Sequence, residues 1–379
     1  MAWRFTWLRS WDEIWDPGHL TRWRRAIVGG PDVHATTFMH PDVIAAWLSA
    51  TGGEGAYAPF FLHARHDAGQ QVLWLLVRRR AGWSTFLQRA LIPAGGDLFD
   101  YHDPVVTPVR TPGEVLVPGF WLAFAAELRR HEGVWFDTCA LSRIRPECRS
   151  GSLDFPVPAG IAPFVRLDRY TDFESYMASR RKSIREQRRK WERVAAEQGL
   201  SFRQHGAGDT EAVLNWLPKF EAARAARYPG SGLPEGYLRA LASAGLDAGL
   251  VAASTLVLAE RPISWDFSFL MNGVFYNYLG TFDEEFRRLS PGQLHTCRII
   301  EWLFGEQARV FDSLLGLEGY KNDWTDGEAM AQRSGAIRSR AVATRVRRLA
   351  WRGLRRIEQW GPGTAADQRT RYAGAPVGT

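Results

Sequence analysis

The residues best suited to acid–base chemistry are Glu318, Tyr320 and Lys321, which lie close together late in the chain. They follow a short apolar run that ends in Asp312, so we expect a strand that delivers them into a loop at its end. A carboxylate, a phenol and an ammonium group can together accept a proton from an amine, orient a leaving thiolate and stabilise an oxyanion. The alternative interpretation is a salt bridge between Glu318 and Lys321 in an ordinary loop.

A helix is expected to begin at Ser290-Pro291-Gly292, about twenty residues before that loop. Proline is favoured at the first helical position, and the first amide groups of a helix can face an anion. We therefore assign Ser290 and Gly292 to binding of a phosphate-tailed acyl donor, with Arg287 and Arg288 as charged contacts to its phosphate. An ordinary helix cap is the alternative.

Three further residues are candidates for the same chemistry. His295 lies one turn into the predicted helix and is an alternative base, although a structural histidine fits the same position. Asp312 at a strand end and Tyr278 on the preceding strand lie where a cleft should open. The run Asp100-Tyr101-His102-Asp103 has metal-binding residue types, but all four crowd one turn, so we predict a loop and no metal site.

The composition indicates a globular protein with anionic partners. The 379 residues suggest two domains, and the 45% hydrophobic content can form a core. A net charge of +7 favours coenzyme phosphates, acidic carrier proteins, anionic lipid or RNA. The three cysteines are widely spaced and indicate reduced thiols. Residues 1–15 lack a signal-peptide core, and no apolar run approaches the roughly 20 residues of a membrane span, so we expect a cytoplasmic protein.

The two halves of the sequence have similar patterns. Residues 55–63 and 71–79 read as a strand pair, as do residues 249–259 and 262–269, which a third strand at 273–280 follows. In each half a Pro-Gly pair then opens a helix, and a short strand comes after it. These helix-and-strand segments are 118–130 with 134–137, and 291–306 with 310–312. The pattern predicts a duplicated α/β (α+β) unit, with mixed sheets flanked by helices.

Domain boundaries follow from this duplication. We predict an N-terminal unit at 1–158, degenerate in function, and a catalytic unit at 159–335 with an inserted basic helix. The Pro-rich stretch 156–163 is the expected linker. A basic amphipathic helix is predicted at 336–360, and residues 361–379 are expected to be disordered.

Two basic segments offer surfaces for partners. The run from Arg180 to Lys190, in a helical stretch expected over 173–198, can bind an acidic carrier protein, lipid headgroups or a tRNA backbone, or it can be a solvated helix face. Residues 341–360 alternate arginines with apolar residues and include Trp351 and Trp360. That pattern is typical of a helix on an anionic membrane surface, and docking onto the protein itself is the alternative.

Three motifs carry a resemblance to a known family: Tyr276-Asn277-Tyr278-Leu279-Gly280, Ser290-Pro291-Gly292, and Phe311-Asp312 with Gly316-x-Glu318-x-Tyr320-Lys321-x-x-Trp324. Together they resemble the CelD/BcsL group of the GNAT acyltransferase superfamily. The basic helix from Tyr176 to Arg193 and the opening Phe38-x-His40-Pro41 are similar to segments of that group and of FemAB-type transferases. The resemblance covers about residues 30–330 and is strongest in 270–325.

The resemblance implies tandem GNAT-like domains and direct acyl transfer from acyl-CoA, with no metal. Members of the group have been linked to polysaccharide acetylation and to N-acylation of sphingoid bases, as in bacterial ceramide synthase-like enzymes, whereas FemAB relatives use aminoacyl-tRNA. The stretch 287–292 departs from the usual phosphate loop, because it has little glycine and Pro291 lacks an N–H. An acyl carrier protein is therefore an alternative donor.

We interpret the sequence as an N-acyltransferase that moves an acyl group from a thioester to a lipid-like long-chain amine, with no covalent enzyme intermediate. The alternatives are acetylation of an exopolysaccharide or its precursor, aminoacyl transfer from tRNA, and a non-catalytic assembly factor for envelope synthesis. A cytoplasmic protein bound peripherally to the inner membrane fits the lipid interpretation.

Overall fold

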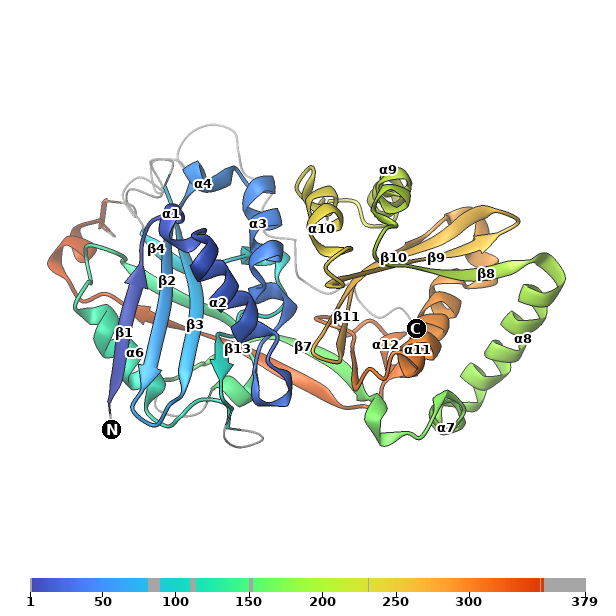
Figure 1. The fold of residues 1–379 in the computed structure, drawn as a ribbon, viewed down its shortest axis with the longest axis horizontal. Coiled ribbons are helices and arrows are strands. Elements are labelled where there is room, and N and C mark those ends of the chain that lie inside the picture. The colour runs from blue at the N-terminus through green and yellow to red at the C-terminus, as the bar shows by residue number, and fades with distance from the viewer. Residues whose placement is uncertain are drawn as a thin grey trace.

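The fold is built on one continuous sheet that runs through two similar units (Figure 1). The computed structural model describes residues 2–80, 89–109, 114–149, 153–230, 232–347 and 349–350. Within these residues the strand order is β1-β2-β3-β4-β6-β13-β7-β12-β11-β10-β9-β8, and β5 pairs with β3. Neighbours are antiparallel except for β4 with β6 and β11 with β12, which are parallel.

The elements of the first unit and their bounds, in chain order, are β1 (Trp3–Leu8), α1 (Trp11–Ile14), α2 (Pro17–Ile27), α3 (Pro41–Ala50), α4 (Gly53–Ala56), β2 (Tyr57–His66), β3 (Gln71–Arg79), β4 (Ala90–Pro93), β5 (Val105–Thr107), α6 (Phe120–Arg129), β6 (Thr138–Ile144) and β7 (Val157–Arg166). Those of the second are α7 (Phe173–Ser179), α8 (Lys182–Gln198), β8 (Leu200–His205), α9 (Thr210–Arg227), α10 (Tyr237–Gly245), β9 (Val251–Leu258), β10 (Arg261–Met271), β11 (Val274–Phe282), α11 (Pro291–Gly305), β12 (Val310–Asp312), α12 (Lys321–Trp324) and β13 (Ala329–Arg338).

Each unit repeats the same sequence of elements. A strand and helices come first, then an antiparallel hairpin, a third strand, a helix, and a short strand parallel to the third. In the first unit these are β1, α2–α3, β2–β3, β4, α6 and β6. In the second they are β8, α9–α10, β9–β10, β11, α11 and β12. The strand order is therefore the same when it is counted inward from either end of the sheet, which confirms the predicted tandem α/β architecture.

The two units exchange a strand where they meet. β13 comes at the end of the second unit in sequence, yet it pairs with β6 of the first unit, with Ala336 opposite Ala140. β7 leaves the first unit and pairs with β12 of the second, with Phe311 opposite Val165. β7 and β13 also pair with each other, from Ala329 opposite Pro163 onward. The centre of the sheet is therefore made from both units.

Helices cover both faces of the second unit. α11 packs on β9, β10 and β11, with α7 and α8 beside it, and α9 and α10 lie on the other face (Figure 1). α10 also packs against α3 of the first unit, so the helices on that face bridge the two units. Aromatic side chains fill the cores of both units: Trp74 and Trp121 pack on each other in the first, Trp324 lies in the second, and all three are almost completely buried. The high tryptophan content of the chain is therefore largely structural in the described residues.

Several predicted boundaries were wrong. Residues 134–137 form turns, and the strand begins at Thr138. The Pro-rich stretch 156–163, expected to be a linker, belongs to strand β7 from Val157 onward. The basic helical stretch 173–198 is two helices that break at Arg180 and Arg181. The C-terminal helix predicted from residue 336 begins only at 342, because residues 336–338 complete β13.

The shared strands predict that both units unfold together. Replacing Ile337 of β13, which is 4% exposed, with alanine should lower the stability of the whole chain by about 2–5 kcal/mol. Urea unfolding followed by tryptophan fluorescence and far-UV circular dichroism should still give one coincident transition. The exposed Val342→Ala is the matched control and should leave the midpoint in place. Two separate transitions would contradict the coupling.

Candidate active site at the divergence of two parallel strands

The candidate site forms where β11 and β12 separate. Their parallel pairing covers only Val274–Tyr276 and Val310–Asp312. After Asp312 the chain follows β7 instead, since the amides of Ser313 and Gly316 donate to Pro163 O and Ile161 O at 2.9 and 3.0 Å. Within the described residues, 277–282 of β11 therefore lack a strand partner on that side. An extended ligand can pair with such an edge through its own amide groups.

A β-bulge lies at the point of divergence. The register between β10 and β11 shifts between Phe267 and Phe269, so β11 carries an extra residue there. Ser268 fixes the bulge, because its Oγ accepts from the Tyr278 amide at 3.1 Å and donates to Asp266 Oδ1. Bulges of this kind re-aim backbone and side chains next to active sites.

Asp266 is the most strongly perturbed carboxyl group at this place. It is 4% exposed, and burial raises its pKa to about 7, although the hydrogen bond from Ser268 opposes the shift. Gly280 lies opposite it on β11, and a Cβ there would be 3.4 Å from Asp266 Oδ2. The missing side chain thus leaves the carboxyl group next to the free edge of β11.

The loop after β12 brings together the three residues that the sequence singled out first. Glu318 Oε2 lies 3.0 Å from Lys321 Nζ, as the alternative salt-bridge interpretation expected. Lys321 is buried and also donates to the carbonyl oxygens of Leu314 and Leu315 at 3.3 and 2.8 Å. Tyr320 precedes α12 and is 42% exposed. Partial burial and the nearby Glu318 and Asp266 raise the pKa of Tyr320, so its hydroxyl is protonated at neutral pH.

This loop can lie close to β7 because of Gly160. A Cβ at Gly160 would be 2.6 Å from Leu315 Cδ2, and the residue has a φ of +135° that favours glycine. The side chain of Leu315 occupies that space. The position of Glu318 and Tyr320 therefore depends on a glycine that lies about 160 residues earlier in the chain.

Asp312 joins the two units. Its carboxylate accepts from Tyr101 Oη at 2.9 and 2.7 Å and from the Leu314 amide at 2.8 Å. Burial raises the pKa of Asp312 to about 6, while these hydrogen bonds oppose the shift. Because both oxygens are occupied and the residue is 1% exposed, its geometry suits a positioning role.

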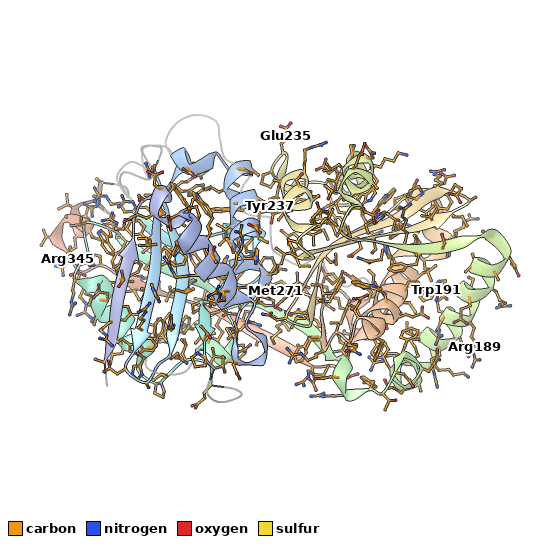
Figure 2. The ribbon with its side chains drawn as sticks, in the orientation of Figure 1. Arg189, Trp191, Glu235, Tyr237, Met271 and Arg345 are labelled. Carbon is orange, nitrogen blue, oxygen red and sulfur yellow. The ribbon has the colours of Figure 1, made fainter. Side chains whose placement is uncertain are left out.

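Tyr278 also contacts the first unit. Its Oη donates to Leu98 O at 2.8 Å and lies 3.4 Å from Tyr237 Oη. Figure 2 shows Tyr237 on α10, on the side of that helix that faces the first unit. Asp100 lies in the same loop of the first unit as Leu98, and its carboxylate accepts from the Leu315 amide at 3.3 Å. Burial raises the pKa of Asp100, and the charge of Arg143 opposes that shift.

The beginning of α11 is less open to an anion than the sequence suggests. Ser290 adopts the left-handed conformation with φ 52°, and its side chain makes no capping bond. The amides of Gln293 and Leu294 both donate to Ser290 O at 3.1 Å, and Pro291 has no N–H. Within the described residues this leaves the Gly292 amide without an acceptor.

Carboxylates surround the arginines next to this helix start. The short helix η6 (Glu284–Leu289) precedes Ser290, and Arg287 makes two bonds to Glu284, at 2.6 and 3.1 Å. Arg261 binds Asp283 and Glu285 at 2.6 and 2.8 Å. Arg288 is exposed on the same short helix.

His295 lies inside the second unit. Its Nε2 and Nδ1 are 2.9 Å from the hydroxyls of Ser254 and Ser264, and the residue is 3% exposed. Burial lowers its pKa to about 3, so the ring is neutral at physiological pH. Both ring nitrogens are occupied, which is the structural alternative that the sequence left open.

One group of side chains has the composition of a metal site within the described residues. The ligand atoms of His34, Asp103 and Cys148 lie within 4.8 Å of one another. However, Arg145 lies among them: it binds Asp103, and its Nη2 is 2.9 Å from His34 Nε2. Burial raises the pKa of the Cys148 thiol well above its usual value. A guanidinium group and a protonated thiol both oppose a bound cation, and the cluster fits a buried ion-pair network instead.

A cavity of about 410 Å³ lies away from this site, between α9 and strands β8 and β9. Its lining is polar and aromatic and includes Arg203, His205, Trp216, Lys219 and Thr255. None of the residues that the sequence assigned to catalysis or donor binding lines it.

Comparisons with known proteins agree with this geometry. Residues 178–322 match the acetyltransferase (GNAT) domain family. The matched stretch begins just before α8 and ends in α12, so it includes the bulge, the start of α11 and the loop with Glu318 and Tyr320. This part of the chain matches a GNAT-type acetyltransferase domain, and that match supports an enzyme.

Two solved structures with TM-scores above 0.5 share the fold at low identity. A structure of FemX is 10% identical, with a TM-score of 0.59, and the alignment covers 88% of this chain and 98% of FemX. The C-terminal domain of a putative lysylphosphatidylglycerol synthetase from Agrobacterium fabrum is 12% identical, with a TM-score of 0.53 and coverages of 88% and 96%. A tandem GNAT protein from the clavulanic acid biosynthesis pathway is 12% identical over 89% of this chain and 99% of its own, with a TM-score of 0.44. No curated protein matches the sequence.

Sequence reasoning missed Asp266, Asp100 and Tyr101. Asp266 stands in the run Ser264-Trp265-Asp266-Phe267-Ser268, where a lone acidic residue between strand-forming aromatics was a usable signal. Asp100 and Tyr101 were dismissed as a loop, because nothing in the sequence places that loop against residues 312–315 of the other unit.

The raised pKa of Asp266 predicts a pH-dependent stability effect. An aspartate in an unfolded chain has a pKa near 3.9, so between about pH 4 and 7 the folded protein keeps a proton that the unfolded chain has released. The stability contributed by this group therefore falls as the pH rises through that window. Asp266→Asn should gain stability relative to the parent by roughly 1.4 kcal/mol per pH unit there.

Urea unfolding at pH 5 and pH 8 measures this effect. Thr281→Val, at a buried position on the neighbouring strand β11, removes a hydroxyl that has no hydrogen-bond partner among the described residues and should shift stability equally at both values. A constant difference between Asp266→Asn and the parent would contradict the assignment.

Proposed function

We propose that this protein transfers an acyl group from a thioester to an amine at the divergence of β11 and β12. The observation that carries the proposal is the free, bulged edge of β11 beside a buried carboxyl group with a pKa near neutrality. An extended thioester arm can pair with that edge, and the acyl carbonyl then lies near Asp266 and Tyr320.

The reaction needs two proton transfers: the attacking amine loses a proton, and the leaving thiolate gains one. The neutral amine attacks the thioester carbonyl, the C–N bond forms, the C–S bond breaks, and the products are an amide and a free thiol. Asp266 is our candidate for accepting the amine proton, because a base works best with a pKa near the operating pH. Tyr320 holds a proton at neutral pH and is the candidate donor to the leaving thiolate. Glu318 is the alternative base, although its ion pair with Lys321 already occupies it.

The contacts of the other predicted residues indicate their roles. Asp312 and Tyr278 position the two units around the reacting groups through Tyr101 and Leu98. Ser290, Gly292 and Arg288 are candidates for contact with the donor phosphate, whereas Arg287 is held by Glu284.

The favoured acceptor is a lipid-like long-chain amine, such as a sphingoid base, as in the ceramide synthase-like members of the CelD/BcsL group. The helix that begins at residue 342 supports this choice. Val342, Val346 and Leu349 lie on one face and are 73%, 60% and 67% exposed. On its other side Thr344 and Arg347 bind Asp137 of the first unit. An apolar stripe that faces outward suits contact with a membrane surface, and the rest of the predicted helix, 351–360, lies outside the described residues.

The helix lies at the outer end of the first unit, where Arg345 is labelled in Figure 2, far from the second unit. Contact there would leave the divergence of β11 and β12 open to substrates. A protein bound peripherally to the cytoplasmic membrane surface is therefore the location that we propose. No helix among the described residues is long and apolar enough to span a bilayer.

Acetyl transfer to an exopolysaccharide or its precursor uses the same donor chemistry and is the second candidate. The fold shared with FemX and with the lysylphosphatidylglycerol synthetase domain keeps aminoacyl transfer as a third. Assays of the purified protein with acyl-CoA, acetyl-CoA or aminoacyl-tRNA, and with a long-chain amine or an oligosaccharide as acceptor, separate the three by the mass of the product.

Asp266→Asn should lower kcat/KM for amide formation about 10²–10⁴-fold, because it removes the proton acceptor but keeps the side-chain shape. The parent enzyme should show a rise in kcat/KM as Asp266 ionises near pH 7, and the variant should lose that rise. Activity in a pH series with acyl-CoA and sphinganine measures both effects.

Glu318→Gln is the matched variant for that experiment. Full activity in Asp266→Asn together with loss in Glu318→Gln would assign the base to Glu318. A non-catalytic assembly role would replace the proposal if cells that express Asp266→Asn, Glu318→Gln or Tyr320→Phe in place of the parent gave extracts with undiminished transferase activity.

Replacing Val342, Val346 and Leu349 with serine should weaken binding to vesicles that contain an anionic phospholipid. Each buried side chain of this size contributes about 1.5–3 kcal/mol, so the bound fraction should fall at least about fivefold. Flotation with vesicles measures it. The triple serine variant at Val28, Leu122 and Val134, which are 62%, 62% and 67% exposed, is the control. Equal binding by both variants would contradict a membrane-binding helix.

A further inference from the structure

One face of α8 carries a row of uncompensated positive charges. Arg185, Arg189 and Arg193 follow one another at four-residue spacing, so they lie on the same side of the helix, and all three are exposed. Lys190 is exposed beside them, whereas Lys182, also exposed, lies 3.7 Å from Glu186 and is paired. Figure 2 shows Arg189 pointing away from the body of the protein and Trp191 pointing toward it.

The other basic residues of this helix are already paired. Arg188 binds Glu174 and Glu192 at 2.6 and 2.7 Å, and it lies on the inner side over Phe173. Within the described part of the chain, Arg185, Arg189, Lys190 and Arg193 form no ion pair or side-chain hydrogen bond. The exposed face, called the α8 face below, therefore offers positive charge to a partner.

The α8 face is held at a fixed place beside the donor end of the site. Trp191 is 2% exposed, and its indole nitrogen donates to Leu289 O at 3.2 Å, one residue before the N-cap of α11. At the other end, Arg181 lies 3.7 Å from Asp323 of α12, which also binds Gln293 of α11. α12 follows Tyr320 directly. The helix that carries the charges therefore contacts the two elements that flank the proposed thioester position.

The start of α11 suits one phosphate better than several. A coenzyme A donor brings a diphosphate and a third phosphate, which need several amide donors or free cations. Here Pro291 has no N–H, and Ser290 O occupies the next two amides after Gly292. Asp283, Glu284 and Glu285 neutralise Arg261 and Arg287. The Gly292 amide and Arg288 are enough for a single phosphodiester.

We propose that the acyl donor is a thioester on the phosphopantetheine of an acidic acyl carrier protein, which docks on the α8 face. The inference rests on the proposed acyl transfer and names its donor. Phosphopantetheine is attached to a carrier protein by one phosphodiester, which suits the start of α11. The negative charges that the coenzyme would supply as phosphates then come from acidic side chains of the carrier, opposite Arg185, Arg189 and Arg193.

The size of the α8 face also fits a protein helix. Eight residues separate Arg185 from Arg193, a rise of about 12 Å, which is about two turns of a partner helix. Complementary charge on such a small area mainly accelerates encounter and orients the partner. The proposed function takes a thioester donor, which a carrier protein supplies and tRNA does not, although tRNA is also a polyanion. In each turnover the amide product forms, and the carrier leaves with its thiol free and protonated.

The test compares three donors with sphinganine as acceptor: palmitoyl-CoA, palmitoyl-pantetheine and a purified acyl carrier protein that carries a palmitoyl group. The parent enzyme should use the carrier-bound donor with the highest kcat/KM, and rising salt should lower that value more than the value for palmitoyl-pantetheine. Replacing Arg185, Arg189 and Arg193 with glutamate should lower the ratio of kcat/KM for carrier to kcat/KM for pantetheine at least about tenfold.

Matched charge reversals at the exposed Arg22, Arg25 and Arg129, on α2 and α6 of the first unit, serve as the control and should keep the ratio of the parent. Circular dichroism and thermal unfolding establish that each variant is folded. A parent enzyme that prefers palmitoyl-CoA, or an unchanged ratio in the α8 variant, would overturn the inference while leaving acyl transfer intact.

Two further outcomes are distinguishable. Transfer from aminoacyl-tRNA alone, lost in the α8 variant, would overturn the carrier protein and assign the α8 face to RNA. Failure of all three thioesters, palmitoyl-pantetheine included, would instead remove the proposed function itself.

Discussion

The antiparallel pair of β7 and β13 is the constraint on which the rest of the structure depends. Each strand belongs to one unit by sequence and completes the sheet of the other. Because strands in a ladder share backbone hydrogen bonds, neither unit can move far without breaking pairs at the centre. The loop 313–316 runs along β7, so the same pair also sets where Glu318 and Tyr320 lie. The pairing of β7 with β13 at the centre of the sheet therefore also fixes the geometry of the site.

Polar contacts between the units then define the site. Tyr101 and Asp312 form one contact, Tyr278 and Leu98 another, and Asp100 with the Leu315 amide a third. All three join the loop after β4 in the first unit to the strands that diverge in the second. The first unit lies outside the stretch that matches the GNAT domain family, yet its loop after β4 makes all three contacts with the site. Buried polar contacts of this kind fix geometry more than they add stability.

The fold was largely predictable from the sequence, because the signals were local. Alternating apolar residues gave the hairpins, and the Pro-Gly pairs gave the starts of α6 and α11, each within a few residues. The exchange of β7 and β13 could not be foreseen, since it depends on pairing between residues far apart in the chain. Residues 156–163 contain three prolines within or beside a strand, which made a linker the more reasonable interpretation.

The site was predictable only in part for the same reason. The sequence grouped Glu318, Tyr320 and Lys321 and identified the start of α11, because those residues are neighbours. It placed His295 among the bases, but the hydroxyls of Ser254 on β9 and Ser264 on β10 contact both nitrogens of that ring. Asp266 became visible only when the register put it opposite Gly280. Burial, which raises its pKa, is a property of the folded sheet and not of the neighbouring residues.

The exchanged strand also has a consequence for synthesis on the ribosome. β6 ends at Ile144, but its partner β13 begins only at Ala329, so the first unit cannot complete its sheet until nearly the whole chain has been made. Such distant pairing is slow, and an exposed strand edge meanwhile can pair with other chains. A nascent chain would therefore have to keep the edge of β6 covered during elongation. Premature termination anywhere before residue 338 would leave both units incomplete, not just the one that was shortened.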